Sequence, residues 1–246
     1  MSMGLQAQKT QTWRWKRLYL RVFDQESVKD TLLLSTFLMM SNINKILVWN
    51  CRGAASSSFY RNCKNCLDIH HPEILAIMET HISPLKLQQS FQLMGFDGFN
   101  YSENRGFAGG IIVVWKSNKV DVEEASKHFQ YIHLKIKMQN GGYWFFTTVY
   151  ASPVEDLRTE LWDELGRMAN IMDDRWLVAG DFNDILGPNE KKGGAVVNRR
   201  KCSLFRDRID ACSLIDLGAV GSKYTWRGPI HNKERIFEQF RSRYEQ

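Results

Sequence analysis

Five polar residues of this chain lie at the ends of short apolar runs, where they could act together as one site. They are Asn50, Glu79, Tyr150, Asp181 and Asn183. The apolar runs read as buried strands, and α/β proteins place their sites at the sheet edge where strands end. The sequence therefore predicts a site that combines two carboxylates, two amides and a phenol.

Glu79 is the candidate metal ligand. It follows the apolar run 74–78. Hydrolysis of a phosphodiester needs a cation that polarises the phosphoryl oxygens, and Mg²⁺ typically binds through one or two carboxylates while it keeps several waters. A carboxylate at a strand end is the right kind of ligand. Taken alone, such a residue is more often structural.

Asp181 and Asn183 are two further candidate site residues. They follow the apolar run 176–179, and residues two apart on an extended chain can point the same way. Gly180 lets the backbone turn there or approach a ligand closely. Because Asp and Asn are common in turns, a turn without a chemical role is the alternative. The sequence Gly-Asp-Phe-Asn after such a strand favours a functional role.

Asn50 and Tyr150 complete the candidate site. The neutral amide of Asn50 could hydrogen-bond a phosphate or a metal-bound water without adding charge. The phenol of Tyr150 could donate a proton to a phosphate oxygen. A tyrosine at the end of a strand is equally often part of the core, and this alternative stays open.

Alternating strands and helices must position these residues. Strands are expected at residues 43–49, 74–78, 111–115, 131–138, 143–150, 176–179 and 214–217, and helices at residues 56–70, 83–94, 155–172 and 199–212. Ser56 to Ser58 can cap the first helix, and Gly141-Gly142 predicts a hairpin. The alternation, with one clear hairpin, predicts an α/β fold with mixed sheets.

The 246 residues are enough for one large domain, and the net charge of +6 with a pI near 9.0 only weakly favours a polyanionic partner. The five cysteines fit no secreted disulfide pattern, so reduced thiols in an intracellular protein are expected. Cys63 and Cys66, with His70 and His71 nearby, could suggest zinc. Their helical spacing instead predicts the buried face of a helix.

Residues 1–42 form an extra N-terminal segment that is expected to be poorly ordered. A basic and aromatic nucleic-acid-binding arm is the alternative, because Trp13 and Trp15 alternate with basic residues. The apolar run 31–40 is too short to span a bilayer, so no membrane association is expected.

Five motifs together resemble the endonuclease/exonuclease/phosphatase superfamily. They are Trp49-Asn50-Cys51-Arg52-Gly53, Met78-Glu79-Thr80, Val149-Tyr150-Ala151-Ser152-Pro153, Gly180-Asp181-Phe182-Asn183 and Tyr224-Thr225-Trp226. They are most similar to the endonuclease domain of plant LINE-type (non-LTR) retrotransposons, which is itself similar to apurinic/apyrimidinic endonucleases. The resemblance implies two packed mixed β-sheets flanked by helices, a four-layer sandwich, over residues 43–238.

The resemblance also implies roles for the residues. Glu79 would bind Mg²⁺, with Mn²⁺ as an alternative, and Asp181 would orient and deprotonate the attacking water. Asn50, Tyr150 and Asn183 would hold the phosphate of DNA. Trp226 would flank the DNA. Arg52 is a candidate for contacts with the DNA backbone, as are Arg105, Lys191 and Lys192, although solvated loop charge explains each of these cations equally well. A nuclear location would follow only from the substrate.

The chain departs from the family pattern near its C-terminus. The family continues after Thr-Trp to an Asp and then to Ser-Asp-His, whereas Gln239-Phe240-Arg241-Ser242 leaves that pattern and residues 239–246 form a divergent tail. The fold is therefore expected to be incomplete at the C-terminus, and the reverse transcriptase that normally follows in the family is not expected in this chain. A catalytically inactive nucleic-acid-binding remnant, or a phosphatase or phosphodiesterase of the superfamily with another substrate, are the alternative functions.

Overall fold

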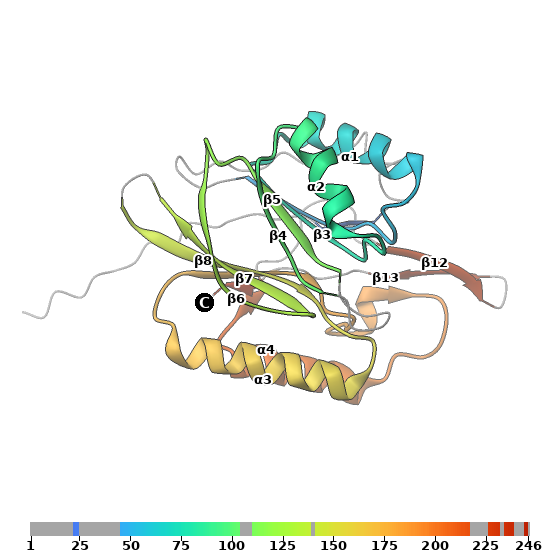
Figure 1. Cartoon of the computed structure of the whole chain (residues 1–246). Helices are drawn as coiled ribbons and strands as arrows, with labels where there is room; N and C mark the ends of the chain where they lie inside the picture. The colour runs from blue at the N-terminus through green and yellow to red at the C-terminus, as the bar shows by residue number, and fades with distance from the viewer. Residues whose placement is uncertain are drawn as a thin grey trace, which may run out of the picture.

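Two sheets lie face to face between two pairs of helices in the computed structural model (Figure 1). The structure describes residues 45–103, 110–138 and 141–216, and the strand segments 22–24, 226–231, 234–238 and 244–245. Of the predicted extra segment 1–42, only Val22–Asp24 is therefore described. The prediction that this segment is poorly ordered remains a prediction.

The first sheet has the strand order β1 (Val22–Asp24), β2 (Ile46–Asn50), β3 (Ile74–Met78), β5 (Ile112–Trp115) and β4 (Gly98–Tyr101). The first three strands are parallel, whereas β5 is antiparallel to both of its neighbours. Helices α1 (Ser57–His70) and α2 (Pro84–Leu93) cover its outer face (Figure 1). As predicted, Ser56 caps α1, because its side chain accepts a hydrogen bond from the Phe59 N–H.

The second sheet has the strand order β11 (Ile215–Asp216), β14 (Tyr244–Glu245), β9 (Trp176–Asp181), β8 (Tyr143–Tyr150), β7 (Tyr131–Lys137) and β6 (Asp121–His128). The pair β8–β9 is parallel, and its connection is helix α3 (Glu155–Ile171). Helix α4 (Arg199–Ala211) lies beside α3 on the outer face (Figure 1). The prediction of two packed mixed sheets flanked by helices is confirmed.

A short 3₁₀ turn, η1 (Pro188–Glu190), and a small third sheet follow β9. This sheet has the order β10 (Lys191–Lys192), β13 (Glu234–Glu238) and β12 (Trp226–His231), and its strands are antiparallel. The sequence had not predicted this sheet. Strands β4 and β6 were also missed, because β4 is only four residues long and β6, with the sequence DVEEASKH, is mostly polar and shows no apolar alternation.

Alternation along the strands divides the core into three apolar layers. On β2, Ile46 and Val48 face the second sheet, whereas Leu47 and Trp49 face the helices above. The same alternation on β9 sends Leu177 between the sheets and its neighbours toward α3 and α4. The side chains that continue the inner face past the strand ends therefore meet between the sheets.

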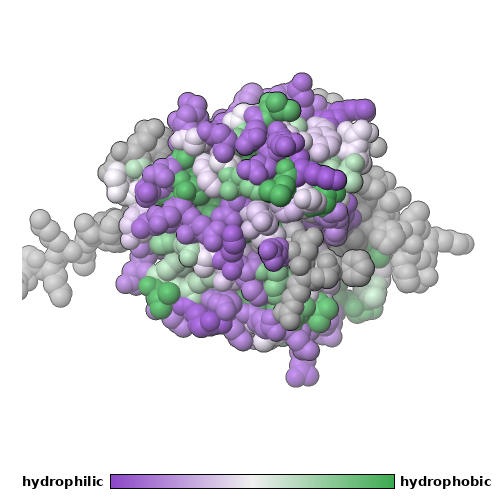
Figure 2. Space-filling view, viewed as in Figure 1, coloured by the Kyte–Doolittle hydropathy of each residue, from purple (hydrophilic) through white to green (hydrophobic). Residues whose placement is uncertain are grey.

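The cysteines take the positions that the helical spacing predicts. Cys63 and Cys66 are buried on the inner face of α1, and burial raises the pKa of the Cys66 thiol to about 11. No described helix is long and apolar enough to cross a membrane. On the face drawn in Figure 2, hydrophobic residues are scattered among hydrophilic ones.

A buried arginine joins the two loops that carry part of the candidate site. The Arg158 side chain, on α3, is only 3% exposed. Its Nη1 donates to the Ser152 carbonyl at 2.9 Å, and its Nε lies 3.0 Å from Asp184 Oδ2. Ser152 follows β8 and Asp184 follows β9, so one guanidinium group ties together the segments after both strands.

We predict that Arg158→Met lowers the free energy of unfolding by about 3 kcal/mol, because it removes the nearest cation from the half-buried Asp184 carboxylate. Burial already raises the pKa of Asp184 to about 6, and Arg158 opposes this rise. Urea unfolding measures the loss. The double variant Arg158→Met/Asp184→Asn should lose less than the sum of the single variants, and additive losses would contradict the proposed coupling.

The alternation along β7 places His133 on the same face as Lys135 and Lys137, where an exposed ring would be expected. The ring is instead buried and stacks on Phe145, with ring centroids 5.0 Å apart. Trp176 Nε1 donates to Thr147 Oγ1 at 2.6 Å, which leaves the Thr147 proton available for His133 Nδ1 at 2.7 Å. Burial lowers the pKa of His133 from its ordinary 6.5 to about 4, so the folded protein holds this histidine in its neutral form.

This burial predicts a loss of stability in acid. The unfolded chain takes up the His133 proton near pH 6.5 and the folded chain only near pH 4, so the free energy of unfolding falls as the pH drops through this window. The full effect is about 3 kcal/mol. His133→Gln keeps an acceptor but does not titrate. Between pH 7 and pH 4, the free energy of unfolding of wild type should therefore fall by about 3 kcal/mol relative to that of His133→Gln. A difference between the two proteins that stays constant with pH would refute the prediction.

Candidate functional site

The predicted site residues meet where strands of both sheets end. Asn50 is the last residue of β2, and Tyr150 and Asp181 are the last residues of β8 and β9. Glu79 directly follows β3. The registers pair Asn50 with Met78 and Tyr150 with Asp181, so each sheet presents adjacent strand ends at the same level.

The Asn50 amide links the two sheets. Its Nδ2 donates to Glu79 Oε1 at 2.7 Å and to Asp181 Oδ2 at 2.8 Å. Its Oδ1 accepts from the Arg52 N–H at 3.2 Å, and the side chain is buried. A single neutral amide therefore holds two carboxylates close to one another. The sequence did not predict this contact between the two sheets.

Asp181 is almost fully buried. Burial raises the pKa of its carboxyl to about 6, and the nearby Glu79 adds to the rise. Hydrogen bonds from the Asn183 N–H at 3.0 Å and from Asn50 oppose it, as does the charge of Arg52. A carboxyl that titrates near neutrality can both accept and release a proton.

Gly180 allows two strands to approach closely. A Cβ at this position would lie 1.8 Å from the Val149 carbonyl oxygen, so the absence of a side chain lets β8 and β9 pair here. This pairing places Asp181 beside Tyr150 at the strand ends.

Glu79 reaches the site through an unusual backbone conformation. On β3, Ala76 and Met78 face the second sheet, so a regular strand would send the next side chain toward the helices. Glu79 instead adopts a left-handed conformation with φ of 54°. The Gly53 N–H donates to its carbonyl at 2.7 Å and stabilises this turn. Strained backbone of this kind is concentrated at functional sites.

The phenol of Tyr150 is buried and hydrogen-bonds the Glu79 side chain. Burial, together with the charges of Glu79 and Asp181, raises the pKa of Tyr150 well above its ordinary value. The group therefore stays protonated and acts as a donor. The sequence left open whether Tyr150 belongs to the site or to the core. In the structure it contributes to both, because its phenol contacts Glu79 and its ring packs in the layer between the sheets.

Asn183 and Arg52 lie in the same open cleft. Asn183 has a φ of 49° and donates from Nδ2 to the Ala151 carbonyl at 2.6 Å. Arg52 has a φ of 48° and an exposed side chain. The cleft is lined by these residues together with Glu79, Asp181, Lys191 and Lys201. Carboxylates thus lie at its base, with cations at its rim.

The other predicted contacts are only partly described. Trp226 begins β12, but its side chain lies outside the described residues, as does Arg105. Lys191 and Lys192 form β10, and only Lys191 lines the cleft. His81 was missed by the sequence reasoning, although it lies two residues after Glu79. Its Nε2 is 3.8 Å from Glu79 Oε2.

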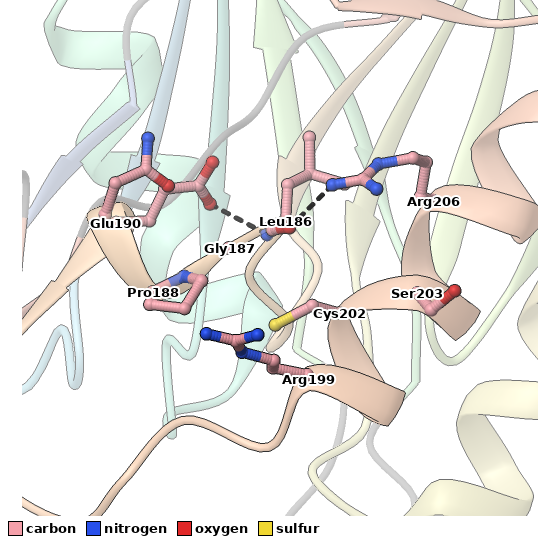
Figure 3. A pocket seen from close by; sticks show the side chains of 9 residues that line it. Leu186, Gly187, Pro188, Glu190, Arg199, Cys202, Ser203 and Arg206 are labelled. Atoms are coloured by element: carbon pink, nitrogen blue, oxygen red, sulfur yellow. Dashed lines mark hydrogen bonds between the residues drawn. The ribbon is translucent and has the colours of Figure 1, made fainter.

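A second pocket lies between the loop after β9 and helix α4, and its lining includes Leu186, Cys202 and Arg206 (Figure 3). Its polar groups hold the loop itself, because Glu190 Oε2 accepts from the Leu186 N–H at 2.9 Å and Arg206 donates to the Leu186 carbonyl at 3.1 Å. Glu190 is 1% exposed. The hydrogen bonds in this pocket therefore stabilise the loop after β9, which also borders the cleft. The cleft at the strand ends is the candidate site.

Comparison with known proteins identifies the fold. Solved structures share this fold at sequence identities so low that they show a common fold but not a common function. Three of them illustrate this. The endonuclease domain of TRAS1, a telomere-specific non-LTR retrotransposon, is 12% identical, covers 82% of this chain and 84% of its own, and has a TM-score of 0.61. The AP endonuclease LMAP from Leishmania major is 14% identical, covers 83% and 79%, and has a TM-score of 0.58. The 3′ phosphatase NExo from Neisseria, bound to a product DNA hairpin, is 14% identical, covers 82% and 86%, and has a TM-score of 0.56.

A search of curated proteins gave no match. The model of the endonuclease/exonuclease/phosphatase family, however, matches residues 47–230, which span β2 to β12 and contain all five residues of the predicted site. The resemblance that the sequence motifs suggested is confirmed. The chain belongs to the endonuclease/exonuclease/phosphatase family.

Proposed function

We propose that this chain is a divalent-metal-dependent endonuclease of the retroelement type, which hydrolyses phosphodiester bonds of DNA. One observation carries the proposal: the Asn50 amide holds the Glu79 and Asp181 carboxylates together at the base of a cleft. Buried carboxylates converge in this way where a site needs a cation and a base.

The residues present fit a hard divalent cation. The charge of Glu79 raises the energy of the charged form of Asp181, and a cation bound at Glu79 would relieve this repulsion. Glu79 would hold Mg²⁺, or Mn²⁺ as the alternative. The metal, when bound, supplies Lewis-acid polarisation of a phosphoryl oxygen.

The other residues take roles that their hydrogen bonds support. Asp181 would accept the proton of the attacking water, for which a pKa of about 6 is suitable. Tyr150 stays protonated and would donate to a phosphate oxygen. Asn183 would hold the phosphate with the amide N–H that it does not give to the Ala151 carbonyl. Both amide N–H groups of Asn50 are used on Glu79 and Asp181, so Asn50 would keep the two carboxylates in place.

DNA is the proposed substrate for two reasons. Arg52, Lys191 and Lys201 line the cleft that holds the carboxylates, and such cations position a nucleic-acid backbone without reading its sequence. Several proteins of similar fold act on DNA or were solved with it, including the Neisseria phosphatase with its product hairpin. Trp226 would flank the DNA from β12.

The test is the nicking of supercoiled plasmid by purified protein with Mg²⁺ or with EDTA. We predict that Glu79→Gln and Asp181→Asn each lower the rate by about 10²-fold or more, because each removes a group that acts in the transition state. Glu160→Gln, at an exposed carboxylate on α3, should nick like wild type and serves as the matched control. Circular dichroism checks that all variants fold.

Two results would contradict this function. DNA retention by wild type and Glu79→Gln without cleavage by either would indicate a nucleic-acid-binding protein that does not hydrolyse. Faster hydrolysis of a phospholipid or a poly(A) strand than of DNA would place the chain with the family's other phosphodiesterases.

A further inference from the structure

Hydrogen bonds join the segments that follow β8 and β9. The Ala151 N–H donates to the Asp181 carbonyl at 2.8 Å, and the Ala151 carbonyl accepts from Asn183 Nδ2 at 2.6 Å. One of the two amide N–H groups of Asn183 is therefore bound to the backbone, and the proposed function gives the other one to the phosphate. The position of the Ala151 carbonyl thus decides how the Asn183 amide is oriented.

The next residue, Ser152, is held by its backbone on both sides. Its N–H donates to Gln130 Oε1 at 2.6 Å, and its carbonyl accepts from Arg158 Nη1 at 2.9 Å. All three residues are buried. A buried polar group that loses its partner keeps the full cost of its desolvation, so these two hydrogen bonds resist displacement of Ser152. Because Ala151 directly precedes Ser152, they also restrain the Ala151 carbonyl.

Gln130 connects several segments from outside the cleft. It lies in the turn between β6 and β7, is 0% exposed, and is not among the described residues that line the cleft. Its Nε2 donates to the Leu157 carbonyl of α3 at 2.7 Å, and its own carbonyl accepts from the Tyr150 N–H at 2.9 Å. Any effect of this side chain on a substrate must therefore pass through the segments that it holds.

Arg158 restrains Asn183 by a second route. Its Nε lies 3.0 Å from Asp184 Oδ2, and Asp184 directly follows Asn183 in the chain. The same guanidinium group holds the Ser152 carbonyl. Arg158 therefore acts both on the backbone of Asn183 and on the segment that carries the hydrogen-bond acceptor of its amide.

We propose that Gln130 and Arg158 are positioning residues, which orient the Asn183 amide for the phosphate through the segment that contains Ala151. This inference rests on the proposed function, which assigns the phosphate to Asn183. Without either side chain the Ala151 carbonyl can shift, and a small displacement of a group that holds the reacting phosphate lowers the rate strongly. The binding of DNA changes less, because the cations at the rim of the cleft are untouched.

Solvent exchange of the Asn183 side-chain amide, measured by NMR on the full chain without DNA, tests the orientation directly. The signal is assigned by its absence in Asn183→Asp. In wild type, the hydrogen that is bonded to the Ala151 carbonyl should exchange more slowly than the other one. Gln130→Met and Arg158→Met should each accelerate its exchange about tenfold, because each loosens that hydrogen bond. If one variant does not fold, the other still provides the test.

Two controls separate positioning from a general loss of stability. Arg167→Met makes the same change at an exposed arginine of α3, which pairs with Glu164. Phe91→Leu removes buried volume in the layer beneath α1 and α2, so it destabilises the fold away from these segments. Neither control should change the exchange of the Asn183 amide.

Nicking kinetics provide the second readout. Gln130→Met should lower kcat about tenfold or more, whereas its KM for plasmid should change by less than about twofold. Arg167→Met and Phe91→Leu should keep the kcat of wild type at a temperature where all variants are folded.

Unchanged exchange of the Asn183 amide in the folded Gln130 and Arg158 variants would overturn the inference. An equal acceleration in Phe91→Leu, or a raised KM with unchanged kcat in Gln130→Met, would also overturn it. The inference and the proposed function can fail separately, because exchange is measured without DNA. Nicking by wild type with unchanged exchange in the variants removes only the positioning role. Faster exchange in the variants, without nicking by wild type, removes only the nuclease activity.

Discussion

The packing of the two sheets against each other is the constraint on which the site depends. The layer between them is closed by fully buried side chains from both sheets, including Val48, Ala76, Phe146 and Ala179. Because this layer fixes one sheet relative to the other, the ends of β2 and β9 come close enough for Asn50 to contact Asp181. Loosening the layer would separate the carboxylates that the amide now joins.

The site concentrates negative charge in a place where folding disfavours it. The buried Asp181 carboxyl has a pKa of about 6, and the phenol of Tyr150 is held in its neutral form. One amide, one backbone N–H and the charge of Arg52 only partly offset the burial of Asp181. Such an arrangement destabilises the folded chain unless a cation binds, and pKa values shifted in this way are concentrated at functional sites.

Much of the fold could be predicted from local sequence signals. The Ser56 cap, the hairpin at Gly141-Gly142 and the amphipathic helix α3 formed where the sequence indicated, because each depends on residues near one another in the chain. The burial of His133 could not be predicted in this way. Its strand alternates as a half-buried strand should, but Phe145 and Trp176, from two other strands, cover the ring.

The sequence by itself determined which residues could form the site, since strand ends and residue types are local properties. The tertiary structure alone decided that the Asn50 amide joins the carboxylates of two sheets. It also decided that Gly180 lets two strands approach, and that a left-handed backbone at Glu79 points its side chain to the face opposite the one a regular strand would give. It also placed His81 beside Glu79. These features depend on hydrogen bonds and packing between segments far apart in the chain, which no local pattern encodes.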